Sequence, residues 1–325
     1  MSERAGADPG SGAFSKEEVD ERGALRRLRA LWQFTRPHTI LGSTLSLCGI
    51  YTITAARTGQ LGAPRGLWAL VLALAVVLAG NVYIVGINQI RDVEIDRINK
   101  PYLPLAAGDL TTRVAMVLVC VTGVAALIAA LVIAPLSCFL LLALALLIGS
   151  AYSLPPLHLK RFPVWAALCI VVVRGPIVNV GATWYFNAAL GAPREIPPSV
   201  WVLTAFVTGF AFAIAWLKDI PDIDGDRRFN ILTLSARLGA RSVFRLGRAW
   251  LSACYLGVVG AVILGVPGLN RPFLIVSHLA VVAWVWIASR RVQPGEKASI
   301  TRFYMFVWRL FALEYVLFPI ACVIA

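Results

Sequence analysis

The sequence predicts an all-α membrane protein, a bundle of nine transmembrane helices around a central cavity with a cytoplasmic cap. Hydrophobic residues make up 59% of the 325-residue chain and charged residues only 14%, whereas soluble domains carry about a quarter charged residues. The apolar residues gather in nine segments. Each segment is near the roughly 20 residues that a helix needs to cross a bilayer.

The apolar segments are joined by polar connections. They span about 39–56, 68–89, 114–134, 136–152, 164–186, 200–217, 244–265, 273–289 and 303–324. The third and fourth segments are divided only at Ala134–Pro135, so the count of nine depends on that division. Residues 1–25, which are rich in Gly, Ser, Ala and acids, are expected to form a disordered tail. Residues 26–325 then form a single transmembrane domain.

The net charge of +13 is explained by loop topology, and no nucleic-acid partner is expected. With the N-terminus inside, the cytoplasmic loops carry Arg91, Arg97, Lys100, Lys160, Arg161, Lys218, Arg227, Arg228, Arg237, Arg241, Arg290, Arg291, Lys297 and Arg302. The opposite loops carry only Arg57, Arg65, Arg194 and Arg271. This asymmetry predicts a cytoplasmic N-terminus, or the equivalent side of an organelle membrane, in a multi-pass protein surrounded by lipid.

Three polar residues spaced four apart follow the second apolar segment. If the helix continues through Asn88, Asp92 and Asp96, they share one face. Two carboxylates one turn apart repel each other unless a cation lies between them. Carboxylate and amide oxygens suit Mg²⁺ better than Zn²⁺. The alternative is a solvated helix end with scattered charges.

A second acidic cluster follows the sixth apolar segment. Asp219, Asp222 and Asp226 are spaced three and four apart, and the run from Asp222 to Asn230 repeats the pattern from Asp92 to Asn99. The repeat suggests an internal duplication, about 30–160 and 161–325. Two acidic helix ends on one membrane side favour Mg²⁺ ions that bridge a diphosphate. Ordinary loop acids are the alternative, and an EF-hand is disfavoured because the twelve-residue loop and its terminal Glu are missing.

Several basic residues accompany the acidic clusters as candidate ligands for diphosphate oxygens. They are Lys160, Arg161, Lys218, Lys100 and Arg36. The alternative, strongest for Arg161, is that these cations only set topology.

One arginine, Arg174, falls midway along the fifth apolar segment, where a charge is costly. It is expected to be the counter-ion of an anionic substrate, or else to pair with Glu314, the one acid deep in an apolar segment.

Taken together, these motifs resemble the intramembrane aromatic prenyltransferases of the UbiA superfamily. The resemblance runs from about residue 30 to the end and is closest to the homogentisate prenyltransferases of tocopherol and prenylquinone biosynthesis. It rests on 36–40, 88–89, 92–96, 99–106, 218–226 and 234–239. Ala107-Gly108-Asp109 departs from that branch, which tends to have Ser-Gly-Glu. The spacing from Tyr152 to Lys160 is longer than in some relatives.

The resemblance implies Mg²⁺-dependent transfer of a phytyl or geranylgeranyl group from its diphosphate to the ring of homogentisate, with decarboxylation. It implies catalytic and metal-binding roles for Asp92, Asp96, Asp222 and Asp226, with Asn88 and Asp219 as further metal ligands. Arg174 and Tyr152 are candidates for binding the aromatic acid, and residues 100–109 and 229–239 are expected to form the cap. The alternatives are another aromatic or chlorophyllide-type acceptor and, from a different class, a secondary transporter.

Overall fold

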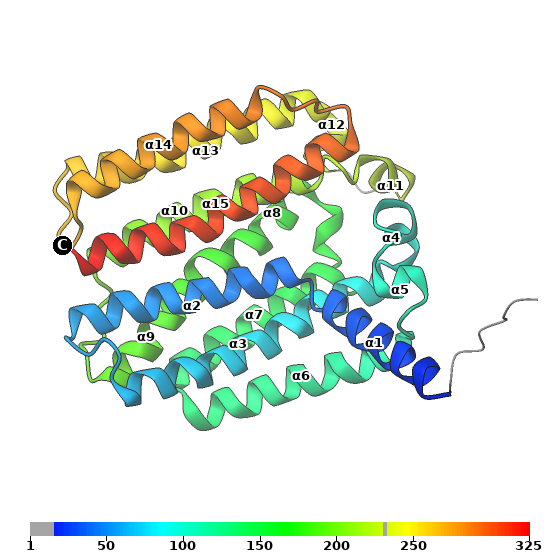
Figure 1. Cartoon of the computed structure of the whole chain (residues 1–325), viewed down its shortest axis with the longest axis horizontal. Helices are drawn as coiled ribbons and strands as arrows, with labels where there is room; N and C mark the ends of the chain where they lie inside the picture. Colours follow the sequence, from blue (N-terminus) through cyan, green and yellow to red (C-terminus); the bar gives the residue numbers. More distant parts are fainter. Residues whose placement is uncertain (1–15, 230–232) are drawn as a thin grey trace, which may run out of the picture.

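A computed structural model of the chain describes residues 16–229 and 233–325, with side chains from residue 24 onward. Long helices lie side by side across the molecule, and short helices gather at the end where α1 (Lys16–Phe34) also lies (Figure 1). Asn230, the last residue of the second acidic pattern, lies outside the described residues. Residues 16–25 belong to α1, so this part of the tail that was expected to be disordered is helical instead.

Nine candidate membrane spans are found in the described chain, which confirms the predicted number. They are α2 (Pro37–Arg57), α3 (Pro64–Arg91), α6 (Thr112–Ile133), α7 (Leu136–Ser153), the continuous run α8 (Pro163–Val172), η2 (Val173–Ile177) and α9 (Val178–Leu190), α10 (Pro198–Lys218), α13 (Ala240–Ile263), α14 (Arg271–Ser289) and α15 (Lys297–Val323). The division at Ala134–Pro135 is confirmed. Ala134 follows α6 in an extended conformation, and Pro135, which cannot continue a helix because it lacks an N–H group, directly precedes α7.

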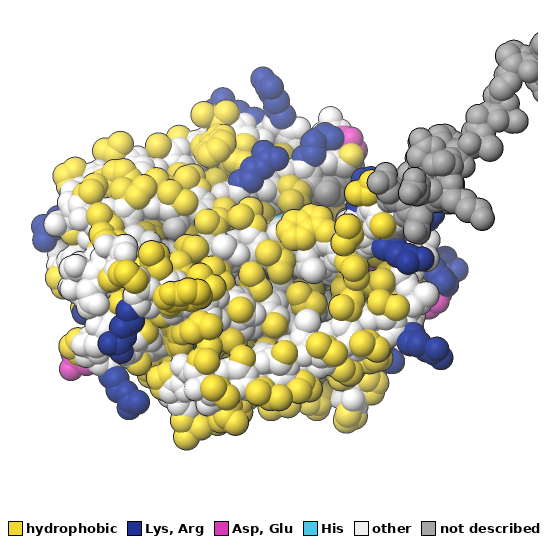
Figure 2. Space-filling view, turned by 60° about the horizontal axis from the view of Figure 1, so that its bottom comes forward, with side chains coloured by type: hydrophobic (Ala, Val, Ile, Leu, Met, Phe, Trp, Pro, Cys, Tyr) yellow, Lys and Arg dark blue, Asp and Glu magenta, His cyan; other side chains and the backbone are white. Residues whose placement is uncertain are grey.

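The apolar surface of the bundle fits a lipid environment. Along α6, Val117, Val121, Val124, Ile128 and Leu131 are all exposed on one face. Figure 2 shows hydrophobic side chains across the middle of the molecule, with Lys and Arg mainly around its margins. A contiguous apolar surface of this kind is rare on soluble monomers. The protein is therefore an integral membrane protein.

The buried centre of the bundle is formed by α10 and α15 with their neighbours. Phe210 of α10 packs against Phe311 of α15, with ring centroids 5.9 Å apart, and against Tyr255 of α13 at 6.2 Å. All three rings are fully buried. This aromatic packing fixes α10, which carries the second acidic cluster at its end.

The helix that carries the first acidic cluster does not continue as the sequence suggested. α3 ends at Arg91, and Asp92 adopts φ −103° and ψ 11° before α4 (Val93–Asn99) begins. The same design follows α10, where Asp219 to Asp222 lead into α11 (Ile223–Arg228). The expectation of one unbroken helical face is therefore wrong. The acids are spread over a helix end and a short helix that turns across the end of the bundle.

Short helices cover this end of the bundle. α5 (Pro104–Ala107) and α12 (Leu234–Leu238) lie beside α4 and α11, and the 3₁₀ turn η1 (Leu159–Arg161) follows α7. An exposed ion pair between Arg26 and Asp109, at 2.5 Å, joins α1 to the loop after α5. These elements form the expected cap, which encloses the cavity described next.

Candidate active site

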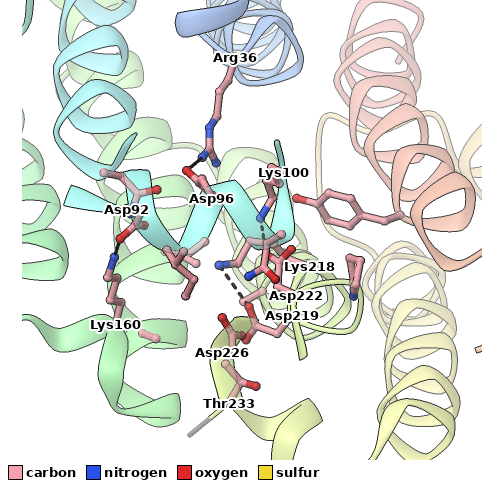
Figure 3. A pocket seen from close by; sticks show the side chains of 18 of the residues that line it. Arg36, Asp92, Asp96, Lys100, Lys160, Lys218, Asp219, Asp222, Asp226 and Thr233 are labelled. Atoms are coloured by element: carbon pink, nitrogen blue, oxygen red, sulfur yellow. Dashed lines mark hydrogen bonds and ion pairs between the residues drawn. The ribbon is translucent and has the colours of Figure 1, made fainter. Parts of the chain in front are cut away.

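A cavity of about 370 Å³ opens at the capped end of the bundle. Its wall contains both acidic clusters, which the sequence separated by more than a hundred residues. The predicted residues on it are Asn88, Asp92, Asp96, Asp219, Asp222, Asp226, Arg36, Lys100, Tyr152, Lys160 and Lys218 (Figure 3). The size is typical of sites for small molecules.

The first cluster is organised around Asp92. Asn88 Nδ2 donates a hydrogen bond to Asp92 Oδ2 at 2.8 Å. The other oxygen, Asp92 Oδ1, accepts from Lys160 Nζ, which the turn η1 brings under the end of α3. Lys160 is itself buried, and the Asp92 carboxylate compensates its charge, as a buried ammonium group requires.

Asp96 lies one turn further along and is buried. The guanidinium of Arg36, at the start of α2, approaches it with Nη2 4.0 Å from Oδ2. Asp96 Oδ2 has no hydrogen-bond donor among the described residues. Burial raises the pKa of Asp96, and the nearby Arg36 and Lys100 oppose that rise. Asp96 lines the cavity, and its Oδ2, which accepts no hydrogen bond from the described residues, could take a cation as a further ligand beside Arg36.

The second cluster meets the first through Lys100. Lys100 is the residue after α4, and its Nζ contacts Asp222 Oδ2 at 2.5 Å. Lys218 Nζ lies 3.2 Å from Asp219 Oδ1 and 3.4 Å from the Tyr152 hydroxyl. Burial, and then the neighbouring Asp219, raise the pKa of Asp226 to about 7. The acids therefore repel one another, and a bound cation would relieve that repulsion.

Direct contact between α4 and α11 fixes the two clusters relative to each other. Gly225 N donates to Asn99 Oδ1 at 3.1 Å, and Lys297 Nζ from α15 donates to Asn99 O at 3.0 Å. A Cβ atom at Gly225 would stand 2.3 Å from Asn99 Oδ1, so any larger residue there would force Asn99 or α11 to move. Sequence reasoning treated Asn99 and Gly225 as motif residues without a role. It counted Lys297 only as a loop cation, with no signal that linked it to Asn99.

The donor set fits Mg²⁺. Within the described residues, no group of three or more His, Cys, Asp or Glu side chains converges as an all-protein metal cage. Mg²⁺ is usually bound by one or two carboxylates together with waters and substrate phosphates. Two clusters of hard carboxylate oxygens, one of which (Asp96 Oδ2) accepts no hydrogen bond from the described residues, match that mode together with the Lys and Arg side chains of the cavity wall.

Two predicted residues lie elsewhere. Arg161 is exposed, and the wall formed by the described residues includes Lys160 but not Arg161, which favours the alternative that Arg161 only sets topology. The alternative pairing of Arg174 with Glu314 is wrong. Glu314 Oε1 instead lies 3.2 Å from Nε2 of His278, and both side chains are fully buried.

The fold and the cavity together define a helical membrane enzyme whose site is suited to a metal-bound diphosphate. The UbiA prenyltransferase family model matches residues 45–310. The chain belongs to the UbiA prenyltransferase family. It is therefore a prenyltransferase rather than a secondary transporter.

Curated relatives align along most of the chain. Homogentisate phytyltransferase of Synechocystis is 45% identical over 295 residues, which cover 90% of this chain and 96% of that protein. Homogentisate solanesyltransferase of Arabidopsis thaliana is 38% identical, covering 94% and 80%. A structure of a UbiA homologue from Archaeoglobus fulgidus bound to GPP and Mg²⁺ has a TM-score of 0.63 and 17% identity, covering 91% of this chain and all of that one. That structure supports the fold.

Proposed function

We propose that this protein transfers a prenyl group from its diphosphate to the aromatic ring of homogentisate, with loss of the acceptor's carboxyl group. The observation that carries the proposal is the joining of two acidic clusters, each with its own lysine, on one cavity at the end of a membrane bundle. The names of the relatives supply the acceptor and include phytyl, geranylgeranyl and solanesyl donors, of which we propose phytyl or geranylgeranyl.

The acidic residues would hold Mg²⁺. Asp92, Asp96 and Asn88 line the same cavity as Asp219, Asp222 and Asp226. When bound, the metal neutralises charge that develops on the departing diphosphate. In the proposed complex, Lys100, Lys160, Lys218 and Arg36 bind the remaining phosphate oxygens as charge-assisted donors.

Prenyl transfer breaks the C1–O bond of the donor, and the electron pair leaves with diphosphate. A nucleophilic ring carbon of the acceptor forms the new C–C bond to C1 and then loses its proton. The acceptor's carboxylate leaves as CO₂, and a proton takes its place. The short helices over the cavity limit entry of water, which would otherwise capture the allylic cation.

The cavity mouth is proposed to face the cytoplasm or the equivalent organelle compartment. α1 lies at the same end of the bundle as α4 and α11, which line the cavity, and the C-terminus lies at the other end. The basic loops counted above follow the same division, as the positive-inside rule requires.

Purified protein in lipid nanodiscs is expected to convert homogentisate with phytyl or geranylgeranyl diphosphate only when Mg²⁺ is present. Removal of the metal with EDTA should lower product formation by at least about 10³-fold, because in the proposed complex the metal links the carboxylates to the diphosphate. Addition of excess Mg²⁺ should restore it. Product is measured by mass spectrometry. Lack of transfer to homogentisate from any prenyl diphosphate, in protein that stays folded, would refute the proposal.

Lys160 and Arg161 form a matched pair for testing the diphosphate contacts. Lys160→Ala is expected to raise the KM for the prenyl diphosphate about tenfold or more, because it removes a buried charge-assisted donor. Arg161→Ala is expected to leave that KM within about twofold, since Arg161 is solvated. Equal effects of the two changes would show that η1 contributes only general positive charge.

A further inference from the structure

Arg174 lies just beyond the inner end of the cavity. It belongs to the π-helical turn η2, one turn after Ile170, which lines the cavity wall. A Cβ atom at the next residue, Gly175, would stand 2.2 Å from Thr208 Oγ1 of α10. The turn is therefore pressed against α10, and its widened geometry sets the position of Arg174. Isolated π-helical turns within α-helices are frequent at functional sites.

The guanidinium of Arg174 stands among aromatic rings. Its Cζ atom is 4.7 Å from the ring centroid of Trp308 and 5.4 Å from that of Phe311. Within the part of the chain that the structure describes, no carboxylate pairs with Arg174, and its buried Nε has no acceptor. The indole Nε1 of Trp308 is likewise buried without an acceptor. Cation–π contacts leave such N–H groups unsatisfied, and this is costly inside a membrane.

An aromatic wall connects this place with the cavity. Trp308 packs edge-on against His38, with ring centroids 5.0 Å apart, and His38 lines the cavity. Tyr304, one turn before Trp308, lines it as well. A Cβ atom at Gly42 would stand 3.0 Å from Trp308 Cζ3, so glycine on α2 leaves room for the indole ring.

We propose that Arg174 binds the carboxylate of the aromatic acceptor, with the Trp308 N–H as a second donor. The inference rests on the proposed function and deepens it. The acids and lysines at the mouth hold the diphosphate, so this separate cation is available to a second anion. An acceptor bound this way lays its ring along His38 and Tyr304. Its ring carbons then point toward the diphosphate end, and Arg174 selects acceptors that carry a carboxylate.

The test compares Arg174→Gln with wild type on homogentisate and on 2-methylhydroquinone, which has the same ring without the carboxylate. Arg174→Gln is expected to raise the KM for homogentisate about tenfold or more. The KM values for 2-methylhydroquinone and for the prenyl diphosphate should stay within about twofold. Arg174→Lys should restore part of the affinity for homogentisate.

A matched control is Arg248→Gln. Arg248 also stacks on a tryptophan in a membrane helix, 4.1 Å from the Trp286 centroid, but its guanidinium donates a hydrogen bond to Ser289. Its loss should leave the ratio of the two acceptor KM values unchanged. If Arg174→Gln raises both acceptor KM values equally, or neither, the inference is overturned.

A measurement on wild type alone covers the case in which the variants do not fold. The neutral amide of homogentisate should bind at least about tenfold more weakly than homogentisate, measured as competition during transfer. Equal binding overturns the role of Arg174 while the proposed function stands. Absence of any transfer to homogentisate by wild type overturns the proposed function, and the inference with it.

Discussion

Asp96→Asn is expected to lower kcat/KM for prenyl transfer by about 10³-fold, the scale of losing one preorganised charge at the reacting group. Asp96 is buried, and its Oδ2 has no donor in the described structure. The amide has nearly the same shape but lacks the negative charge, so it binds Mg²⁺ more weakly than the carboxylate does. The measurement is steady-state transfer across a series of Mg²⁺ concentrations. Higher Mg²⁺ should recover part of the loss, because the change weakens metal binding.

Glu94→Gln is the control for this change, since Glu94 lies in the same short helix. Glu94 is exposed, and among the described residues its one ion pair is with Arg97, at 2.8 Å; exposed pairs of this kind contribute about 0–1 kcal/mol. Its loss should leave kcat/KM within about twofold. If Asp96→Asn lowered kcat/KM no more than Glu94→Gln does, Asp96 would have no role in metal binding.

The acidic clusters could be found from the sequence because two kinds of pattern coincide there. The long apolar runs predicted the number of spans, since the bilayer sets the length of a helix that crosses it. They also predicted that Asp92 and Asp219 lie at the ends of two of these helices. The spacing of the acids did not show that the helix breaks at Asp92. That break depends on the cap helix α4, which leaves the direction of α3 to reach α11. Such a turn is a tertiary contact, and local periodicity does not encode it.

Partners across the bundle were the least predictable part of the site. Lys100 reaches Asp222 and Lys160 reaches Asp92, although the two partners are 122 residues apart in the first pair and 68 residues apart in the second. The sequence offered Glu314 as the simplest partner of Arg174 because both are charges deep in apolar segments. The structure pairs Glu314 with His278, which a lone histidine in a helix gave no reason to expect. Only the packing of α14 against α15 decides that choice.

The two clusters also depend on each other electrostatically. Each carries a lysine in contact with one of its acids, so the carboxylates are neutralised in pairs while remaining at the cavity wall. Buried acids without such partners would take up protons, as the raised pKa of Asp226 indicates. Lysine is suited to this because its flexible chain can move from a carboxylate to a phosphate oxygen. The contact between α4 and α11 keeps both pairs within reach of one substrate.

Gly225→Ala is expected to lower kcat/KM by about 10²-fold by separating α4 from α11. The added Cβ atom would stand 2.3 Å from Asn99 Oδ1, so Asn99 or the backbone of α11 must move. A displacement of about 1 Å in a reacting group is enough for a loss of this size. Transfer activity and thermal unfolding are measured together. Gly257→Ala is the matched control, because a Cβ atom there meets nothing within 4 Å.

The double change Gly225→Ala with Asn99→Ala separates crowding from loss of the Asn99 hydrogen bond. Asn99→Ala alone leaves Gly225 N without its acceptor and is expected to cost about 1–3 kcal/mol of stability. In the double variant the shorter side chain at position 99 makes room for the new methyl group. The loss of stability in the double variant should therefore be smaller than the sum of the losses in the two single variants. Strict additivity would mean that the two residues do not act on each other. The position of the acids would then be set by α4 and α11 individually.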